Sequence, residues 1–201
     1  LPRIKKQGYV KRGKAPRWHG GKIPYMIDDN VVQAEKVIEA IEYLNTFTNI
    51  KIVPREDEKD YVLVTRGESD CYSYAGKIGG MQEIFLVPQC GVREILHEWM
   101  HTLGFFHEQN REDRDEHLVV NWDNIHETNH AQFKKLPNDF IGLVGRPFDF
   151  QSIMLYHSYT FSMYPNEPAM LTKEGEVIPP SKSLLSDEDI NRVNRAYPKV
   201  Y

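Results

Sequence analysis

The segment from His97 to His107 constrains this chain more than any other, because it sets three histidines at fixed spacings around the end of a predicted helix. Apolar residues recur with a 3.6-residue period over 92–103, which predicts an amphipathic helix. His97 and His101 lie four residues apart on its other side, so two imidazoles can approach one ion. Gly104 ends the helix and permits a turn, which lets His107 return as a third ligand.

This donor set predicts a catalytic metal. Three neutral imidazoles with an open fourth position are typical of catalytic zinc, whereas structural zinc sites use four protein ligands. We therefore expect one Zn²⁺ on His97, His101 and His107. Glu98 is poorly placed as a ligand but can reach a water on the ion, whose pKa zinc lowers to about 7. A carboxylate there can act as general base and pass the proton to a departing amine, which predicts peptide-bond hydrolysis without a covalent intermediate.

Two other interpretations remain open. The first is an amphipathic helix whose polar face carries histidines by accident, since a bare His-Glu-x-x-His recurs by chance. Requiring Gly104 and His107 as well makes this coincidence rare. The second is a zinc-bound binding module without activity. Glu98 argues against it, because a metal site alone has no use for that carboxylate.

Composition and charge narrow the class of protein. The 201 residues are 40% hydrophobic and 27% charged, which is typical of a globular chain with one domain or two tight subdomains. The balance of 25 basic and 29 acidic residues gives a net charge of −4, which does not suggest a nucleic-acid binder. No apolar run has the length of a membrane span. We expect neither nucleic acid nor membrane as a partner.

Periodicity predicts a sheet with helices, followed by an irregular region. A twisted, mostly parallel sheet with one antiparallel edge is favoured, and the chain beyond Gly104 shows weak periodicity apart from a short helix at 124–133. A last helix is expected over 186–196, where Ser186 and Asp189 are similar to a capping box. The expected strands are 23–27, 50–53, 61–65 and 83–87, and the expected first helix is 31–47, capped within 28–30.

The histidine motif, with Ser152–Tyr156 about fifty residues downstream, resembles the metzincin clan of zinc peptidases, in which a methionine-containing turn lies beneath the metal site. Three further segments are similar to the astacin family in particular, and the resemblance covers roughly residues 18–201. These segments are 107–115, 148–150 and 185–190.

The resemblance implies a single α/β (α+β) catalytic domain over 1–201 with the metzincin fold. An N-terminal subdomain, 18–107, would hold a twisted, mostly parallel five-stranded sheet and two long helices. An irregular C-terminal subdomain, 108–201, would end in a helix, with the active-site cleft between the two. Residues 1–17 would form a basic N-terminal arm, which carries no acidic residue. It stays solvated, lies against the acidic remainder of the chain or binds an anionic surface.

By the same resemblance, the three histidines bind zinc, Glu98 is the general base and Met154 forms the turn. Tyr156 would be a further zinc ligand at rest and would hydrogen-bond the oxyanion during catalysis. On the residues alone, the alternative for Tyr156 is an aromatic of the cleft wall, and Met154 would be a core residue.

The chain departs from the family pattern near the third histidine. The family pairs the glutamate after that histidine with a buried N-terminus, for which the arm here is too long. Glu108 would then orient His107 or pair with an arginine. Leu155 stands where the family has histidine, and we interpret His157 as a surface histidine.

Cys71 and Cys90 match one of the two disulfides common in the family, and free buried thiols are the alternative. The missing second cystine and the absence of glycosylation sequons favour a bacterial member. The resemblance further implies a secreted, monomeric endopeptidase with protein or peptide substrates, made as a zymogen that its own prosegment inhibits. The first residue is Leu rather than Met, so we expect a mature or trimmed product.

We expect substrate to bind at the strand that follows Gly79 and Gly80. If this strand lies at the sheet edge, its free backbone groups can pair with an extended peptide, and the glycines allow close approach. The expected contacts are Gly80, Met81, Gln82 and Glu83.

Overall fold

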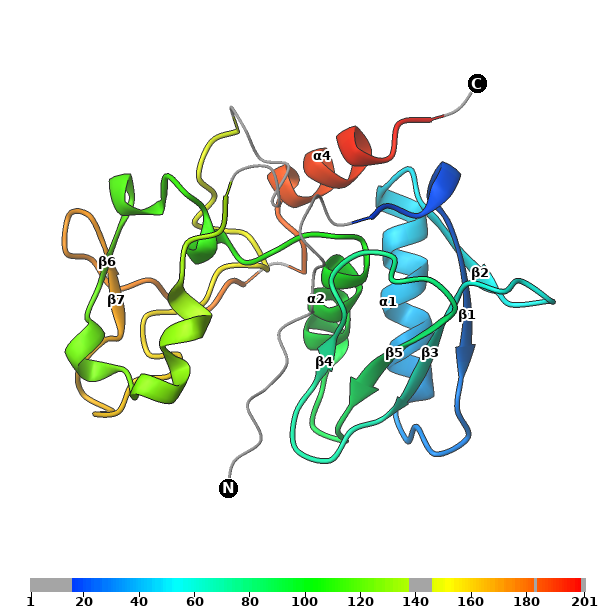
Figure 1. Cartoon of the computed structure of the whole chain (residues 1–201), viewed down its shortest axis with the longest axis horizontal. Coiled ribbons are helices and arrows are strands. Elements are labelled where there is room, and N and C mark those ends of the chain that lie inside the picture. Colours follow the sequence, from blue (N-terminus) through cyan, green and yellow to red (C-terminus); the bar gives the residue numbers. More distant parts are fainter. Residues whose placement is uncertain (1–15, 138–145, 183, 200–201) are drawn as a thin grey trace.

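The structure is a computed structural model that describes residues 16–137, 146–182 and 184–199. A sheet with two helices forms one side of the molecule, and a largely irregular region with a two-stranded sheet forms the other (Figure 1). Most of the basic arm predicted at 1–17 lies outside the described residues. Within the described ranges, no helix is long and apolar enough to cross a membrane.

The main sheet has five strands in the order β2-β1-β3-β5-β4. Neighbours are parallel except β4, which runs antiparallel to β5, so the expected mostly parallel sheet is confirmed. Side chains alternate between its faces, and the inward ones are mostly β-branched or leucine. The bounds are β1 (Lys22–Ile27), β2 (Lys51–Pro54), β3 (Tyr61–Arg66), β4 (Tyr72–Ser73) and β5 (Met81–Leu86).

One expectation about this sheet is wrong. The strand after Gly79 and Gly80 is β5, which pairs with β3 along its whole length and with β4 on its other side. The antiparallel edge is β4. It has two residues, too few to produce an alternating pattern that a sequence can reveal.

The first helix also differs from its prediction. α1 (Ala34–Phe47) begins three residues later than expected, because the Asp28 side chain accepts the Asn30 amide and the Asp28 carbonyl accepts the Val31 amide, which makes a turn there. Val37 lies on the buried face of this helix, whereas Ile38, which we expected there, is 36% exposed. Helix periodicity therefore located the element but misassigned part of its apolar face.

Two apolar cores organise the molecule. The larger lies between the sheet, α1 and α2 (Val92–Thr102), and it also takes in Ile153, Met154 and the C-terminal residues Val193 and Tyr197. The smaller lies in the second half of the chain and includes Phe133, Leu155 and Met170. The first core thus contains residues from before and after position 107. The division of the chain into two subdomains at that position stays a prediction.

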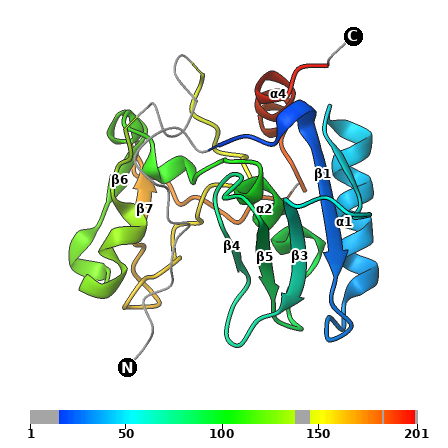
Figure 2. The ribbon, with the colours of Figure 1, turned by 45° about the vertical axis from the view of Figure 1, so that its right-hand side comes forward.

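The second half is mostly irregular, as expected. The segment expected as a short helix contains a 3₁₀ stretch, Glu127–Phe133. The antiparallel pair β6 (Leu118–Val120) and β7 (Met170–Thr172) was not predicted. The last helix, α4 (Asp187–Ala196), has the predicted capping box, in which Ser186 and Asp189 exchange hydrogen bonds. α4 lies near the start of β1 and the C-terminal end of α2 (Figures 1 and 2), and the Tyr197 hydroxyl that follows it donates to the Leu103 carbonyl.

Candidate metal centre

Local sequence explains how α2 presents its histidines. At its start, the Glu94 carboxylate accepts the Gly91 amide, which caps the first turn. At its end, Gly104 adopts a φ of +97°, a left-handed conformation that favours glycine. The Phe105 amide then returns to the Met100 carbonyl. This tight turn reverses the chain and brings His107 back to the helix, as predicted.

The three predicted zinc ligands converge on one point. Nε2 of His107 lies 3.0 Å from Nε2 of His97 and 3.1 Å from Nε2 of His101. One nitrogen from each ring lies within 4.8 Å of the others. No other such group of three or more His, Cys, Asp or Glu side chains occurs in the described part of the chain.

Hydrogen bonds at the Nδ1 atoms determine whether the Nε2 atoms can act as metal ligands. Nδ1 of His97 lies 2.9 Å from the Ile153 carbonyl oxygen, and Nδ1 of His101 lies 2.8 Å from that of Phe105. A carbonyl only accepts, so each Nδ1 carries the proton and each Nε2 of a neutral ring presents a lone pair. The third ring, His107, is hydrogen-bonded by the Asn110 side chain.

The histidines are also held neutral. Burial lowers the pKa of His97 to about 4 and that of His101 to about 3, and burial together with the other two rings lowers the pKa of His107 well below its ordinary value. The three Nε2 atoms therefore stay unprotonated at neutral pH, and their lone pairs remain available. Lone pairs about 3 Å apart repel unless a cation lies between them, so this donor set fits Zn²⁺.

Glu98 directly follows the first ligand and carries a buried carboxylate. The residue is 5% exposed, and Oε2 has no hydrogen-bond partner among the described residues. Burial raises the pKa of Glu98 to about 8, and a divalent cation nearby would favour the ionised form again. A carboxylate in its ionised form can take up a proton.

A cavity of about 570 Å³ opens onto the centre. His97, Glu98 and Tyr156 line it, together with His157, which is half-buried rather than on the surface as we interpreted it. The Tyr156 ring lies 4.5 Å from the ring of His107, centroid to centroid, and its hydroxyl donates to Oε1 of Gln132 at 3.4 Å. Gln132 was missed, since nothing local distinguishes it from any other polar residue.

The predicted turn contacts the metal centre through the backbone of Ile153 and Met154. Met154 is 2% exposed, its amide donates to the Ser152 hydroxyl, and its carbonyl accepts the Glu108 amide. The Glu108 carboxylate is buried between two guanidinium groups, those of Arg111 at 3.1 Å and of Arg192. Of the two roles that we left open for Glu108, the structure contains the arginine pairing.

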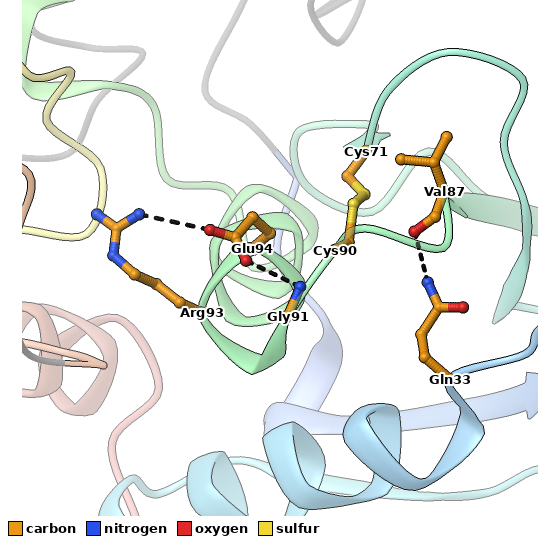
Figure 3. Close-up of a disulfide and its surroundings, with 7 residues drawn as sticks. All are labelled: Gln33, Cys71, Val87, Cys90, Gly91, Arg93 and Glu94. Carbon is orange, nitrogen blue, oxygen red and sulfur yellow. Dashed lines mark hydrogen bonds and ion pairs between the residues drawn. A yellow bond between two sulfur atoms is a disulfide. The ribbon is translucent and has the colours of Figure 1, made fainter.

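The two cysteines form the predicted disulfide (Figure 3). Cys71 directly precedes β4, and Cys90 lies two residues before α2. The bond therefore ties the edge strand to the start of the metal-binding helix. Both cysteines also line the cavity.

The expected substrate contacts in β5 lack the edge position that motivated them. The Gly80 amide donates to Oδ1 of Asp60, and its carbonyl accepts the Tyr61 amide. The Gln82 side chain is buried and hydrogen-bonds the Gly76 carbonyl and the Ile78 amide. Contact of substrate with Gly80, Met81, Gln82 and Glu83 stays a prediction.

The sequence matches a family model over residues 10–198, the model for the peptidase family Astacin. Zinc metalloproteinase nas-6 of Caenorhabditis elegans is 38% identical over 92% of this chain, and zinc metalloproteinase nas-14 of the same organism is 36% identical over 90%. An astacin-like metalloprotease toxin of Loxosceles intermedia is 40% identical over 90% of the chain and is covered to 70%. The chain spans only 55% of the length of nas-6 and 37% of that of nas-14.

Solved structures agree with this match. High choriolytic enzyme 1, a hatching enzyme zinc-protease of Oryzias latipes, superposes with a TM-score of 0.81 at 29% identity, over 95% of this chain and 97% of that one. Myroilysin superposes with a TM-score of 0.66 at 18% identity, over 92% of this chain and 97% of that one, and this similarity concerns the fold alone.

Proposed function

This chain belongs to the astacin family of zinc metalloproteinases, and on that premise we propose that it is a secreted zinc endopeptidase that cleaves protein substrates with Glu98 as general base. The observation that carries the proposal is the pairing of two features at neighbouring residues of α2. Three neutral Nε2 atoms converge on a cation position, and Glu98, whose Oε2 is buried without a partner among the described residues, lines the same cavity as His97.

In the proposed mechanism, His97, His101 and His107 hold the ion. When bound, zinc supplies a Lewis acid and lowers the pKa of a coordinated water to about 7. Glu98 would take up the proton that the water releases and later donate it to the leaving amine. Tyr156, at the cavity wall beside His107, donates a hydrogen bond from its hydroxyl group to the developing oxyanion.

An extended peptide fits the outer side of β4. This strand is the sheet edge, it contacts α2, and the disulfide beside it lines the cavity. Backbone pairing with an edge strand binds many sequences with similar strength, so selectivity would come from the cavity walls. We therefore assign the main-chain contacts of the substrate to this edge of the sheet.

Secretion and activation complete the proposal. The disulfide supports an oxidising compartment, because such bonds form and persist mainly outside the cytosol. By family membership the enzyme would be a monomer that its own prosegment keeps inactive, and a bacterial source stays a prediction of the sequence.

Cleavage profiling tests the proposal. The protein is incubated with a proteome-derived peptide library, in parallel with a sample stripped by chelator and one reloaded with Zn²⁺. We expect internal cleavages that disappear on stripping and return on reloading. Zinc bound at one ion per chain without cleavage would instead identify a binding module and contradict the proposed activity.

A further inference from the structure

We propose that α4 braces the metal centre, with Asp189 and Arg192 as positioning residues for two of the three ligands, His97 and His107. The proposal rests on zinc binding by the histidines and is independent of whether peptides are cleaved. It concerns side chains that come more than eighty residues after the ligands and do not touch the ion.

The first contact runs from Asp189 through the turn to His97. Asp189 is fully buried, and its carboxylate accepts the Ser152 hydroxyl at 2.6 Å and the Ile153 amide at 2.9 Å. The carbonyl of the same residue, Ile153, lies 2.9 Å from Nδ1 of His97. Asp189 thus fixes the peptide segment whose carbonyl sets the tautomer and ring direction of this ligand.

The second contact runs from Arg192 through Glu108, the residue after His107. The Arg192 guanidinium pairs with the Glu108 carboxylate, and it also donates to the Pro147 carbonyl at 2.9 Å and to Glu188 at 3.3 Å. The side chains of Glu108 and Arg192 are only 1% and 4% exposed. Because a buried carboxylate is strongly held by its cations, the backbone at Glu108 and the adjoining His107 cannot shift freely.

Both contacts come from one face of α4. Asp189 and Arg192 are three residues apart, so they project from the same face of α4 toward the centre. The helix is itself fixed at one end by the Ser186 cap and at the other by the Tyr197 hydroxyl bonded to Leu103. The third ligand, His101, is oriented locally by the Phe105 carbonyl.

Zinc affinity, measured by competition with a chelator, tests the brace without relying on activity. Replacing residues that orient metal ligands typically weakens binding by about 10- to 100-fold. We expect a loss of this size for Asp189→Ala and for Arg192→Met. Asp189→Asn should restore most of the affinity, because its amide oxygen can still accept the Ile153 amide, and Arg192→Lys should restore part of it.

Three control variants on α4 separate positioning from stability. Asp187→Ala and Arg195→Met remove exposed side chains of the same types and should leave zinc affinity unchanged. Val193→Ala opens a cavity in the core without touching a ligand, so it should lower the urea midpoint of the zinc-free protein but not the zinc affinity of the folded one. Urea midpoints are measured for every variant, so that each affinity is compared at known stability.

The same substitutions in a His97→Ala background test through which ligand each residue acts on zinc affinity. There Asp189→Ala should cause no further loss of zinc affinity, because the ring that it orients is gone, whereas Arg192→Met should keep its effect through His107. The proposal is overturned if Val193→Ala loses zinc affinity as much as the two positioning variants at equal stability, or if both of those variants bind zinc like the wild type. Absence of zinc from the wild type would overturn it together with the metal assignment, while absence of peptidase activity alone would leave it standing.

Discussion

Nδ1 of His97 and the carbonyl oxygen of Ile153 lie 2.9 Å apart, which joins the metal-binding helix to a turn 56 residues later in the chain. This single hydrogen bond assigns the ring proton to Nδ1 and so directs the Nε2 lone pair at the metal position. The buried turn around Met154 therefore supports a ligand as well as packing in the larger core.

Replacing the proposed general base should separate metal binding from catalysis. Glu98→Ala removes the carboxylate to which we assign proton uptake but leaves all three imidazoles, so we expect zinc at full stoichiometry and a loss in kcat/KM of about a thousandfold. Glu94→Gln, an exposed change on the same helix that keeps an oxygen for the Gly91 amide, is the control. Unchanged turnover in Glu98→Ala would eliminate the proposed role.

Removal of the Tyr156 hydroxyl should act on the transition state. Because the proposed hydrogen bond forms only as the oxyanion develops, Tyr156→Phe should lower kcat by about 10- to 100-fold with little change in KM. Steady-state kinetics on one peptide measure both. A pure effect on KM would mean that Tyr156 binds substrate as part of the cavity wall.

Loss of the disulfide should destabilise the fold more than the active site. The bond spans 19 residues, and opening a loop of this length costs about 3 kcal/mol in the free energy of unfolding. We expect the Cys71→Ser, Cys90→Ser double variant to show this loss in urea denaturation and to retain zinc when folded. A double variant as stable as the wild type would show that the bond contributes nothing at equilibrium.

Stability should fall at alkaline pH through Tyr197. Burial raises the pKa of this phenol to about 12, above its unfolded value of about 10, so the folded state keeps a proton that the unfolded state loses. The contribution is present below pH 10 and is lost as the pH rises through 12. At its steepest the slope approaches about 1.4 kcal/mol per pH unit.

Denaturation from pH 8 to 12 measures this contribution. Tyr197→Phe should be less stable at pH 8, because the hydrogen bond to Leu103 is gone, and should show a shallower decline above pH 10. Tyr164→Phe, at an exposed tyrosine, controls for the titration of the other phenols. Parallel curves for the wild type and Tyr197→Phe would contradict this assignment.

Features encoded locally could be predicted from the sequence. The spacing of His97, His101 and His107, the glycine at the helix end and the cap at Ser186 all act over a few residues, and each is found where the pattern indicated. Glu98 was identified in the same way, because its place beside the first histidine fixes its position on the helix.

Features that depend on distant segments could not be predicted. The sheet edge was misassigned because β4 is two residues long and strand order depends on pairing between segments far apart. Asp189 was predicted only as a helix cap, since its second use needs Ile153, 36 residues earlier, to lie beside it. The partner of Glu108 was left open for the same reason, because Arg192 follows it by 84 residues.

Crystallography of the active protein at the zinc absorption edge, combined with elemental analysis, tests the central claim most directly. We predict one zinc ion per chain and an anomalous peak about 2.0–2.1 Å from Nε2 of His97, His101 and His107. A preparation that cleaves protein while holding no ion at this point, or holding it through other side chains, would contradict the account.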